Sequence, residues 1–346
     1  HTKYIGFPLM YFVCYFLLYK NMKSIQEIRT LIQNGIREID FPDRPSGLYE
    51  PLKYVLSLGG KRLRPLLCLS ACNLYNEEAL SKALPLALGV ELFHNFTLIH
   101  DDLMDRSLVR RNKATVHTKW DEKTAVLSGD ALQIMAFQQI ALAPEDKLKD
   151  CLDLFNQTAR EVCEGQQLDM NFEMLDNVRK EDYIEMVRLK TAVLLGCSLK
   201  LGALIGGAPD NEAGFLYDFG IHLGIAFQIR DDLLDVYGDP DIFGKAIGGD
   251  IVNNKKTFLW IHSIETADNH TRSLFLNCMK SNYIDREEKI KMVTRFYNRL
   301  GARESCEQQM LDHRQSALKA LESLDLDKKR LVTLSELAGK LTYRQV

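Results

Sequence analysis

Cysteines are few and isolated in this sequence of 346 residues. The eight cysteines lie at positions 14, 68, 72, 151, 163, 197, 278 and 306, and no two of them form a CxxC pair. The pattern gives no sign of a zinc site, and most of the cysteines lie in apolar, helical sequence. We therefore expect buried, reduced thiols, which are typical of a cytoplasmic protein.

A large excess of charge of either sign is also missing. The formal net charge is −3, with 26% charged and 46% hydrophobic residues, which is the balance of a soluble globular protein. We expect no binding to nucleic acid, so an anionic substrate would be held by local basic groups or by a metal ion. No Ser-His-Asp or Cys-His arrangement stands out in the sequence.

Strand-like alternation, linkers and low-complexity segments are absent as well, which predicts one all-α domain. From residue 22 onward the apolar residues recur at helical spacing. We expect Pro51 to open a helix that ends at Gly59. Further helices are expected at about 66–76, 80–106, 124–142, 146–170, 180–205, 211–237, 256–266, 270–280, 284–300 and 302–323.

The first 21 residues differ from the rest. They contain an apolar run over residues 5–19, which Pro8 interrupts. This run is shorter than the roughly 20 residues of a membrane span, and no small-residue cleavage site follows it. We expect residues 1–21 to be an extension outside the functional domain, which would occupy residues 22–346. Association of residues 1–21 with a membrane surface is the alternative.

Two acidic motifs of the form DDxxD are the most informative feature. DDLMD lies at 101–105 and DDLLD at 231–235, each after an apolar run that reads as a buried helix. Positions four apart share one face of a helix, so Asp101 and Asp105 would present their carboxylates side by side. Mg2+ prefers such oxygen ligands where a phosphate supplies the others. Two solvated acidic faces are the alternative, but the apolar surroundings of both motifs favour a metal site across a cavity.

A basic stretch, GGKRLRP at 59–65, provides a candidate anion site. Pro65 suits the first turn of a helix, where its missing N–H costs nothing. Lys61, Arg62 and Arg64 would then lie at or just before a helix N-terminus, whose free N–H groups and dipole attract anions. A merely well-capped turn is the alternative reading.

Taken together, these motifs resemble the trans-isoprenyl diphosphate synthases of the polyprenyl synthetase family, from residue 22 to the end. The matches are GGKRLRP at 59–65, His94, DDLMD at 101–105, Arg110 and Arg111 before TVH at 115–117, GQQLD at 165–169, Lys190 and Thr191, FQIRDDLLD at 227–235, GKAIGGD at 244–250, and Lys255. The resemblance implies the all-α isoprenoid synthase fold, a helical bundle around a deep central cavity, and a homodimer. It implies a prenyltransferase that adds isopentenyl diphosphate to dimethylallyl, geranyl or farnesyl diphosphate.

The resemblance also assigns roles to individual residues. Three Mg2+ ions would be coordinated by Asp101, Asp105 and Asp231, with Asp102 and Asp235 in support. The allylic diphosphate would be bound by Arg110, Lys190, Thr191, Gln228, Lys245 and Lys255, and the diphosphate of isopentenyl diphosphate by Lys61, Arg64, His94 and Arg111. Ionisation would depend most directly on Asp101, Asp102, Asp105, Asp231, Arg110, Lys190 and Lys245. The remaining histidines His100, His117 and His222 are expected to be structural.

The sequence departs from the family pattern at two places. Asn112 and Ala114 follow the arginine pair where the family usually has Gly-x-Pro, and Ala246 replaces a proline that often follows the loop lysine. Neither change removes a charged ligand. They bear on loop rigidity rather than on the chemistry.

Product length should depend on the helix before the first motif. Phe96 lies five residues and Thr97 four residues before Asp101, which puts Phe96 about 7 Å below the metal site. A bulky ring there would block a long tail, and the first motif carries no insertion. This combination resembles geranylgeranyl diphosphate synthases, so we expect a C20 product, with C15 as the alternative.

Two other classes share parts of the pattern. A class I terpene cyclase also uses DDxxD with magnesium, and Asp231, Asp235 and Asp239 loosely fit the spacing of its second motif. A cyclase, however, has no use for the second diphosphate site that Lys61 to Arg64 would supply. A non-catalytic regulatory subunit of a prenyl synthase tends to lose its metal carboxylates, whereas both clusters here are whole.

Overall fold

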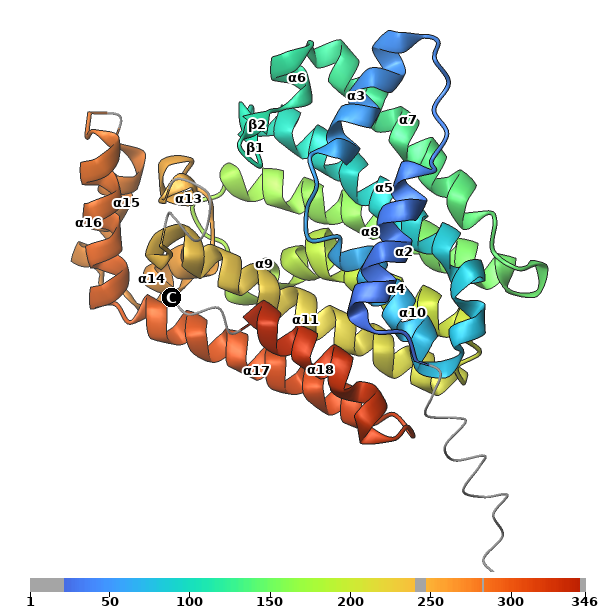
Figure 1. Cartoon of the computed structure of the whole chain (residues 1–346). Coiled ribbons are helices and arrows are strands. Elements are labelled where there is room, and N and C mark those ends of the chain that lie inside the picture. The colour runs from blue at the N-terminus through green and yellow to red at the C-terminus, as the bar shows by residue number, and fades with distance from the viewer. Residues whose placement is uncertain (1–21, 240–246, 282, 343–346) are drawn as a thin grey trace, which may run out of the picture.

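The computed structural model describes residues 22–239, 247–281 and 283–342, and these are almost entirely helical (Figure 1). The helices are α2 (Ile25–Arg37), α3 (Ser46–Ser57), α4 (Leu63–Tyr75), η1 (Glu77–Ala79), α5 (Leu80–Met104), α6 (Val116–Lys119), α7 (Glu122–Ile140), α8 (Glu145–Glu173), α9 (Lys180–Val187), the π-helical η2 (Arg188–Ala192), α10 (Val193–Gly206), α11 (Asp210–Tyr237), α13 (Gly249–Val252), α14 (Phe258–Thr266), α15 (Asn269–Lys280), α16 (Arg286–Arg299), α17 (Ala302–Glu322) and α18 (Lys328–Thr342). Two short strands, β1 (Val109–Arg110) and β2 (Lys113–Ala114), pair antiparallel. The predicted all-α fold is confirmed, while the extension at residues 1–21 lies outside the described residues.

Most predicted helices are found within a few residues of their expected bounds, although the short helices η1, α6 and α13 were not predicted. Pro51 does not open a helix. It lies inside α3, which begins earlier, at Ser46, directly after the extended N-cap residue Pro45. The segment predicted at 180–205 is divided into α9, η2 and α10. Helix α18 follows the last predicted helix and was not foreseen.

The core of the molecule is formed where α10 packs against α4, α5 and α11. Gly202 of α10 lies so close to α4 that a Cβ atom would stand 1.8 Å from the carbonyl oxygen of Cys68, so only glycine allows this contact. Within the described residues, one helical stretch, Lys180–Gly206, is long and apolar enough to cross a membrane. Its apolar window is 83% buried inside the protein, which is the pattern of a core helix.

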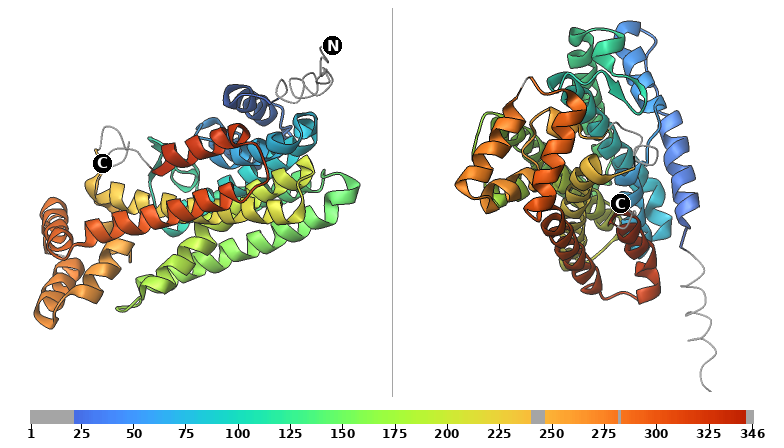
Figure 2. Two further views of the ribbon diagram at one scale, coloured as in Figure 1. Left: turned by 90° about the horizontal axis from the view of Figure 1, so that it is seen from below. Right: turned by 90° about the vertical axis from the view of Figure 1, so that its left-hand side faces the viewer.

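The long helices form layers around this core (Figure 2). Helices α11 and α17 lie side by side, with α18 against α17, and α7 packs on the other face of α5 (Figures 1 and 2). The pair α15 and α16 stands at one end of the bundle. Helices α5 and α11, which carry the two acidic motifs, are therefore both interior elements.

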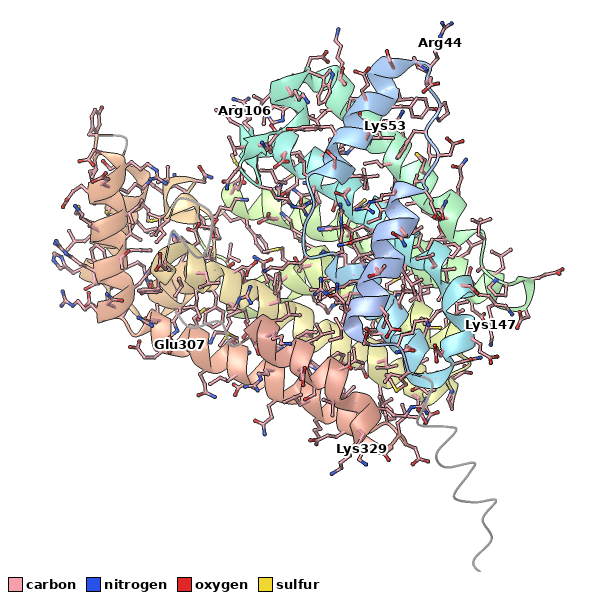
Figure 3. All side chains as sticks on the ribbon, viewed as in Figure 1. Arg44, Lys53, Arg106, Lys147, Glu307 and Lys329 are labelled. Atoms are coloured by element: carbon pink, nitrogen blue, oxygen red, sulfur yellow. The ribbon has the colours of Figure 1, made fainter. Side chains whose placement is uncertain are left out.

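Charged side chains at the periphery project away from the ribbon, as expected for groups that water solvates (Figure 3). Those labelled are Arg44, Lys53, Arg106, Lys147, Glu307 and Lys329. Most of the charged side chains that are buried instead lie on the two motif helices: Glu91 and Asp102 on α5, and Glu212, Arg230, Asp232 and Asp235 on α11, whereas Lys289 is buried on α16. Burial of charge is costly unless it is paired, so these groups point to a functional region.

Candidate active site

A cavity of about 900 Å3 opens between the start of α4, helices α5, α8 and α11, and the η2 turn. Of the predicted site residues, Lys61, Arg64, His94, Phe96, Thr97, Asp101, Arg110, Arg111, Lys190, Thr191, Gln228 and Asp231 line it. A volume of this size accommodates a substrate of some tens of atoms. One cavity thus brings together most of the residues that the sequence singled out.

The first acidic motif presents its carboxylates to lysines from distant segments. Lys190 Nζ lies 3.2 Å from Asp101 Oδ1, and Lys255 Nζ lies 3.1 Å from Asp105 Oδ2. Burial opposes ionisation of Asp101, but Lys190 and Arg110 more than offset it and hold the pKa of Asp101 below its usual range. Asp101 is therefore an anion at neutral pH and is available to a cation.

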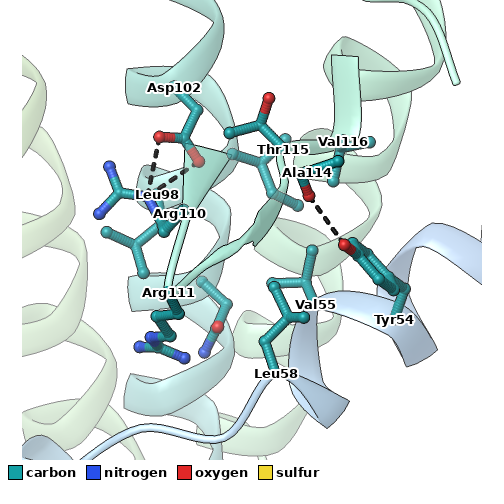
Figure 4. A pocket seen from close by; sticks show the side chains of 12 residues that line it. Tyr54, Val55, Leu58, Leu98, Asp102, Arg110, Arg111, Ala114, Thr115 and Val116 are labelled. Carbon is teal, nitrogen blue, oxygen red and sulfur yellow. Dashed lines mark hydrogen bonds and ion pairs between the residues drawn. The ribbon is translucent and has the colours of Figure 1, made fainter. Parts of the chain in front are cut away.

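Asp102, the neighbour of Asp101, does not line the large cavity but a small pocket of about 20 Å3, where it faces Arg110 (Figure 4). Its two carboxylate oxygens accept hydrogen bonds of 2.8 Å from Nε of Arg110. Burial raises the pKa of Asp102 to about 6, although Arg110 acts in the opposite direction. Asp102 therefore orients Arg110, and its predicted supporting role at the metal site stays a prediction.

The aspartates of the second acidic motif also differ in whether they face the cavity. Asp231 lines the cavity and accepts a hydrogen bond of 2.5 Å from Arg230. Asp232 is buried behind it and accepts hydrogen bonds from the hydroxyl of Tyr183 at 2.6 Å and from Gln228 at 3.1 Å. Asp235 is also buried, and it accepts a hydrogen bond from the backbone N–H of Asp250. Only the first aspartate of this motif faces the cavity.

The donor set suits a metal ion that arrives with its substrate. Among the described residues, no three His, Cys, Asp or Glu side chains lie close enough to hold a metal ion by themselves. Asp101 and Asp231 line the cavity from different helices, α5 and α11. Magnesium is commonly bound by one or two carboxylates while phosphate oxygens and water complete its octahedron. The residues present therefore fit Mg2+ bound jointly with a phosphate-bearing ligand.

The basic end of the cavity contains more positive charge than the acids near it neutralise. Arg62 is paired with Glu91 at 2.6 Å, so its role is structural. Within the described residues no carboxylate forms an ion pair with Arg64, and its buried Nε atom has no hydrogen-bond partner. Burial, together with the weaker effect of nearby Arg111, lowers the pKa of Arg64 to about 10 against the pull of Glu91. An unpaired guanidinium in such a place is suited to an anionic ligand.

His94 lies among these arginines as a neutral imidazole. Burial, followed by the charges of Arg64 and Arg111, lowers the pKa of His94 well below its usual value. A neutral imidazole still has one N–H to donate to a phosphate oxygen. The basic end of the cavity therefore offers both charged and neutral donors.

The backbone around Arg111 explains how Asn112 replaces the usual glycine. Arg111 and Asn112 form the turn between β1 and β2, both with positive φ, at 53° and 59°. Asparagine tolerates this left-handed region better than most residues. The guanidinium of Arg111 donates a hydrogen bond to the carbonyl of Gly59. A Cβ atom at Gly60 would lie 2.7 Å from Nη2 of Arg111, so glycine at position 60 leaves room for the guanidinium. The turn thus places Arg111 in the cavity despite the substitution.

Lys190 and Thr191 are presented by the π-helical turn η2. Such turns occur frequently at functional sites, because they rotate side chains out of the regular helical register. A Cβ at Gly165 of α8 would lie 2.3 Å from the backbone nitrogen of Lys190, so the two segments meet only because residue 165 is glycine. Lys190 Nζ also lies 2.6 Å from Asp169 Oδ2. The cavity-facing hydroxyl of Thr191 donates to Gln228 at 3.3 Å.

Asp169 is a site residue to which the sequence assigned no role. It is the last residue of the GQQLD match, four residues after Gly165, and this helical spacing was the available signal. One predicted ligand, Lys245, lies outside the described residues.

The comparisons with known proteins agree with this site. The polyprenyl synthetase family model matches residues 45–297. A geranylgeranyl diphosphate synthase of Methanosarcina mazei is 42% identical over 249 residues, covering 70% of this chain and 76% of that protein. A geranylfarnesyl diphosphate synthase of Natronomonas pharaonis is 38% identical over 257 residues, covering 69% of this chain and 75% of that protein. A crystal structure of a geranylgeranyl pyrophosphate synthase superposes with a TM-score of 0.89 at 40% identity, covering 94% of this chain and all of that one.

None of these relatives is named a terpene cyclase or a regulatory subunit, so neither alternative gains support. The family match spans most of the chain, including both acidic motifs and the basic stretch before α4. The chain therefore belongs to the polyprenyl synthetase family and is a trans-isoprenyl diphosphate synthase.

Proposed function

We propose that this prenyltransferase condenses isopentenyl diphosphate with dimethylallyl, geranyl and farnesyl diphosphate and releases geranylgeranyl diphosphate (C20), with farnesyl diphosphate (C15) as the alternative product. The observation that carries the proposal is the division of one cavity into two ends. One end has carboxylates paired with lysines, and the other has the unpaired guanidinium of Arg64. Two diphosphates, one with metal and one without, suit these two ends.

The acidic end would hold the allylic diphosphate. Asp101 and Asp105 on one side and Asp231 on the other would hold Mg2+, three ions in all, whose charge offsets that of the departing diphosphate. Lys190 and Lys255, now paired with the carboxylates, would then bind diphosphate oxygens. Arg110, fixed by Asp102, and the amide of Gln228 would bind the same group.

The basic end would hold isopentenyl diphosphate. Lys61, Arg64 and Arg111 supply positive charge, and neutral His94 supplies an N–H donor. Holding the alkene still beside the allylic carbon is a positioning effect that lowers the barrier to carbon–carbon bond formation. The allylic C–O bond breaks, the new C–C bond forms, and the proton lost from the isopentenyl unit passes to the departed diphosphate.

Phe96 would limit the length of the product. Its side chain is 8% exposed and lines the cavity on the same helix as Asp101, five residues before it. The rise of a helix puts this ring about 7 Å from the motif along the helix axis. Tail burial strengthens allylic binding by roughly 0.8 kcal/mol per CH2, which selects for length without speeding ionisation.

The chain would act as a cytoplasmic homodimer. Leu127 and Ile134 on α7 are 60% and 61% exposed, and their spacing of two helical turns puts them on one face. Exposed apolar side chains grouped on one helix suit contact with a second copy. Light scattering tests this directly: the mass should be that of two chains, and Leu127→Glu should reduce it to one.

The experiment that tests the proposed reaction supplies the purified full chain with Mg2+, labelled isopentenyl diphosphate and each allylic diphosphate in turn. The products are dephosphorylated and the alcohols separated. Geranylgeraniol as the main alcohol is the expected result. A wild-type chain that incorporates no label would contradict the proposal.

A further inference from the structure

The ring of Phe96 is held between two other rings on α5. Its centroid lies 5.2 Å from that of Phe93 on one side and 4.8 Å from that of His100 on the other. The contact with His100 is edge-to-face, with an interplanar angle of 71°. Residues four apart in a helix meet in this way, so His100 is positioned to restrict the rotamers of Phe96.

His100 is itself fixed to the neighbouring helix α7. Its Nε2 atom lies 3.1 Å from the carbonyl oxygen of Val126 and 3.9 Å from a carboxylate oxygen of Asp130. Because a carbonyl oxygen can only accept, Nε2 carries the proton and donates it. The imidazole therefore has one defined position relative to α7.

Gly129 provides the space that this position requires. A Cβ atom at residue 129 would lie 2.2 Å from Nε2 of His100 and 2.4 Å from its Cδ2, well inside contact distance. The imidazole thus occupies a slot on α7 that exists because residue 129 has no side chain. From this slot it contacts Phe96, and both rings line the cavity.

We propose that His100 determines product length by holding the ring of Phe96 across the path of the growing tail. This inference rests on the proposed function and refines the expectation that His100 is only structural. The ring of His100 packs against the ring of Phe96, so Phe96 cannot turn toward His100 to make room for a tail longer than C20. His100 is a positioning residue, since its effect on length passes through Phe96.

The test compares the alcohols made by wild type, His100→Ala and His100→Gln from labelled isopentenyl diphosphate and farnesyl diphosphate. Glutamine keeps a donor for the Val126 carbonyl but presents no ring to Phe96. His100→Gln therefore still tests the proposal if the alanine variant fails to fold. The main product of both variants should be longer than that of wild type by one or more isoprene units. His117→Ala, which removes a histidine that does not line the cavity, is the matched control and should leave the profile unchanged.

The double variant Phe96→Ala/His100→Ala separates positioning from a simple gain of volume. If His100 acts through Phe96, the double variant gives the same profile as Phe96→Ala alone, because the ring to be held is already gone. A wild-type profile in both His100 variants would overturn the proposal, and so would a double variant whose products exceed those of Phe96→Ala. Failure of the wild-type chain to incorporate label would instead contradict the proposed function, which keeps the two results distinct.

Discussion

Lys255 lies 150 residues beyond Asp105 in the sequence, yet its Nζ atom is 3.1 Å from the Asp105 carboxylate. Lys190 makes the equivalent contact with Asp101, at 3.2 Å. The first acidic motif is thus already compensated by two ammonium groups before any ligand binds. A cation that arrives alone must compete with these lysines, whereas one that arrives with a diphosphate gives them an anion to bind instead.

This arrangement predicts that magnesium and diphosphate stabilise the protein jointly. Mg2+ alone should change the melting temperature little, because no three carboxylates cluster to hold it in the part of the chain that the structure describes. Mg2+ with inorganic diphosphate at about 100 times Kd should stabilise by about 2.7 kcal/mol and raise the melting temperature by roughly 5 °C. Thermal melts with each component singly and with both will measure this. Full stabilisation by Mg2+ alone would mean that a preformed metal site exists.

Removing one cavity-facing carboxylate should affect the chemical step. Asp101→Asn should lower kcat with farnesyl diphosphate on the order of 1,000-fold, since a bound metal ion contributes several kcal/mol to stabilising the leaving group. Asp153→Asn on α8 is the control, because Asp153 forms an exposed ion pair with Lys149. Steady-state kinetics at saturating Mg2+ compare the two. Equal activity of both variants would show that Asp101 is not a metal ligand.

Arg64→Met should weaken the binding of isopentenyl diphosphate without lowering the stability of the protein. The KM for isopentenyl diphosphate should rise about tenfold or more, because a charge-assisted hydrogen bond contributes about 1.5–3 kcal/mol. The melting temperature of the ligand-free variant should be unchanged or higher, because a buried, unpaired cation beside Arg111 has been removed. Arg179→Met, which breaks an exposed pair with Asp182, should leave KM unchanged. A rise confined to the KM of the allylic substrate would place Arg64 at the wrong end of the cavity.

Phe96→Ala should lengthen the product. The substitution removes the ring that lines the cavity below Asp101 and opens space for at least one more isoprene unit. Separation of the dephosphorylated alcohols compares the variant with wild type. Identical distributions would show that another side chain limits the tail.

The sequence predicted the members of this site better than their orientations. Each motif is local, and the helical repeat places Asp101 and Asp105 on one face, so their shared role follows from spacing. The same repeat rotates Asp102 by about 100° from its neighbour, which turns it toward Arg110. Which of two adjacent aspartates faces the cavity depends on how α5 packs, and packing is not readable from one helix.

Other features depended on contacts between distant segments. Arg62 and Arg64 look equivalent in the basic stretch, and only the proximity of Glu91 on α5 makes one structural and leaves the other unpaired. The π-turn at Lys190 packs directly against Gly165 of α8, a contact that neither segment reveals by itself. Helix α18, by contrast, was missed although Leu331, Leu334 and Leu341 recur at helical spacing, and that signal was available.

The product profile of the wild-type chain is the decisive measurement for the proposed reaction. The chain receives Mg2+, labelled isopentenyl diphosphate and dimethylallyl diphosphate, and the dephosphorylated alcohols are separated by chain length. Geranylgeraniol should be the main alcohol, with shorter alcohols appearing only as intermediates. A cyclic hydrocarbon made from farnesyl diphosphate, or no elongation without an added partner synthase, would contradict it.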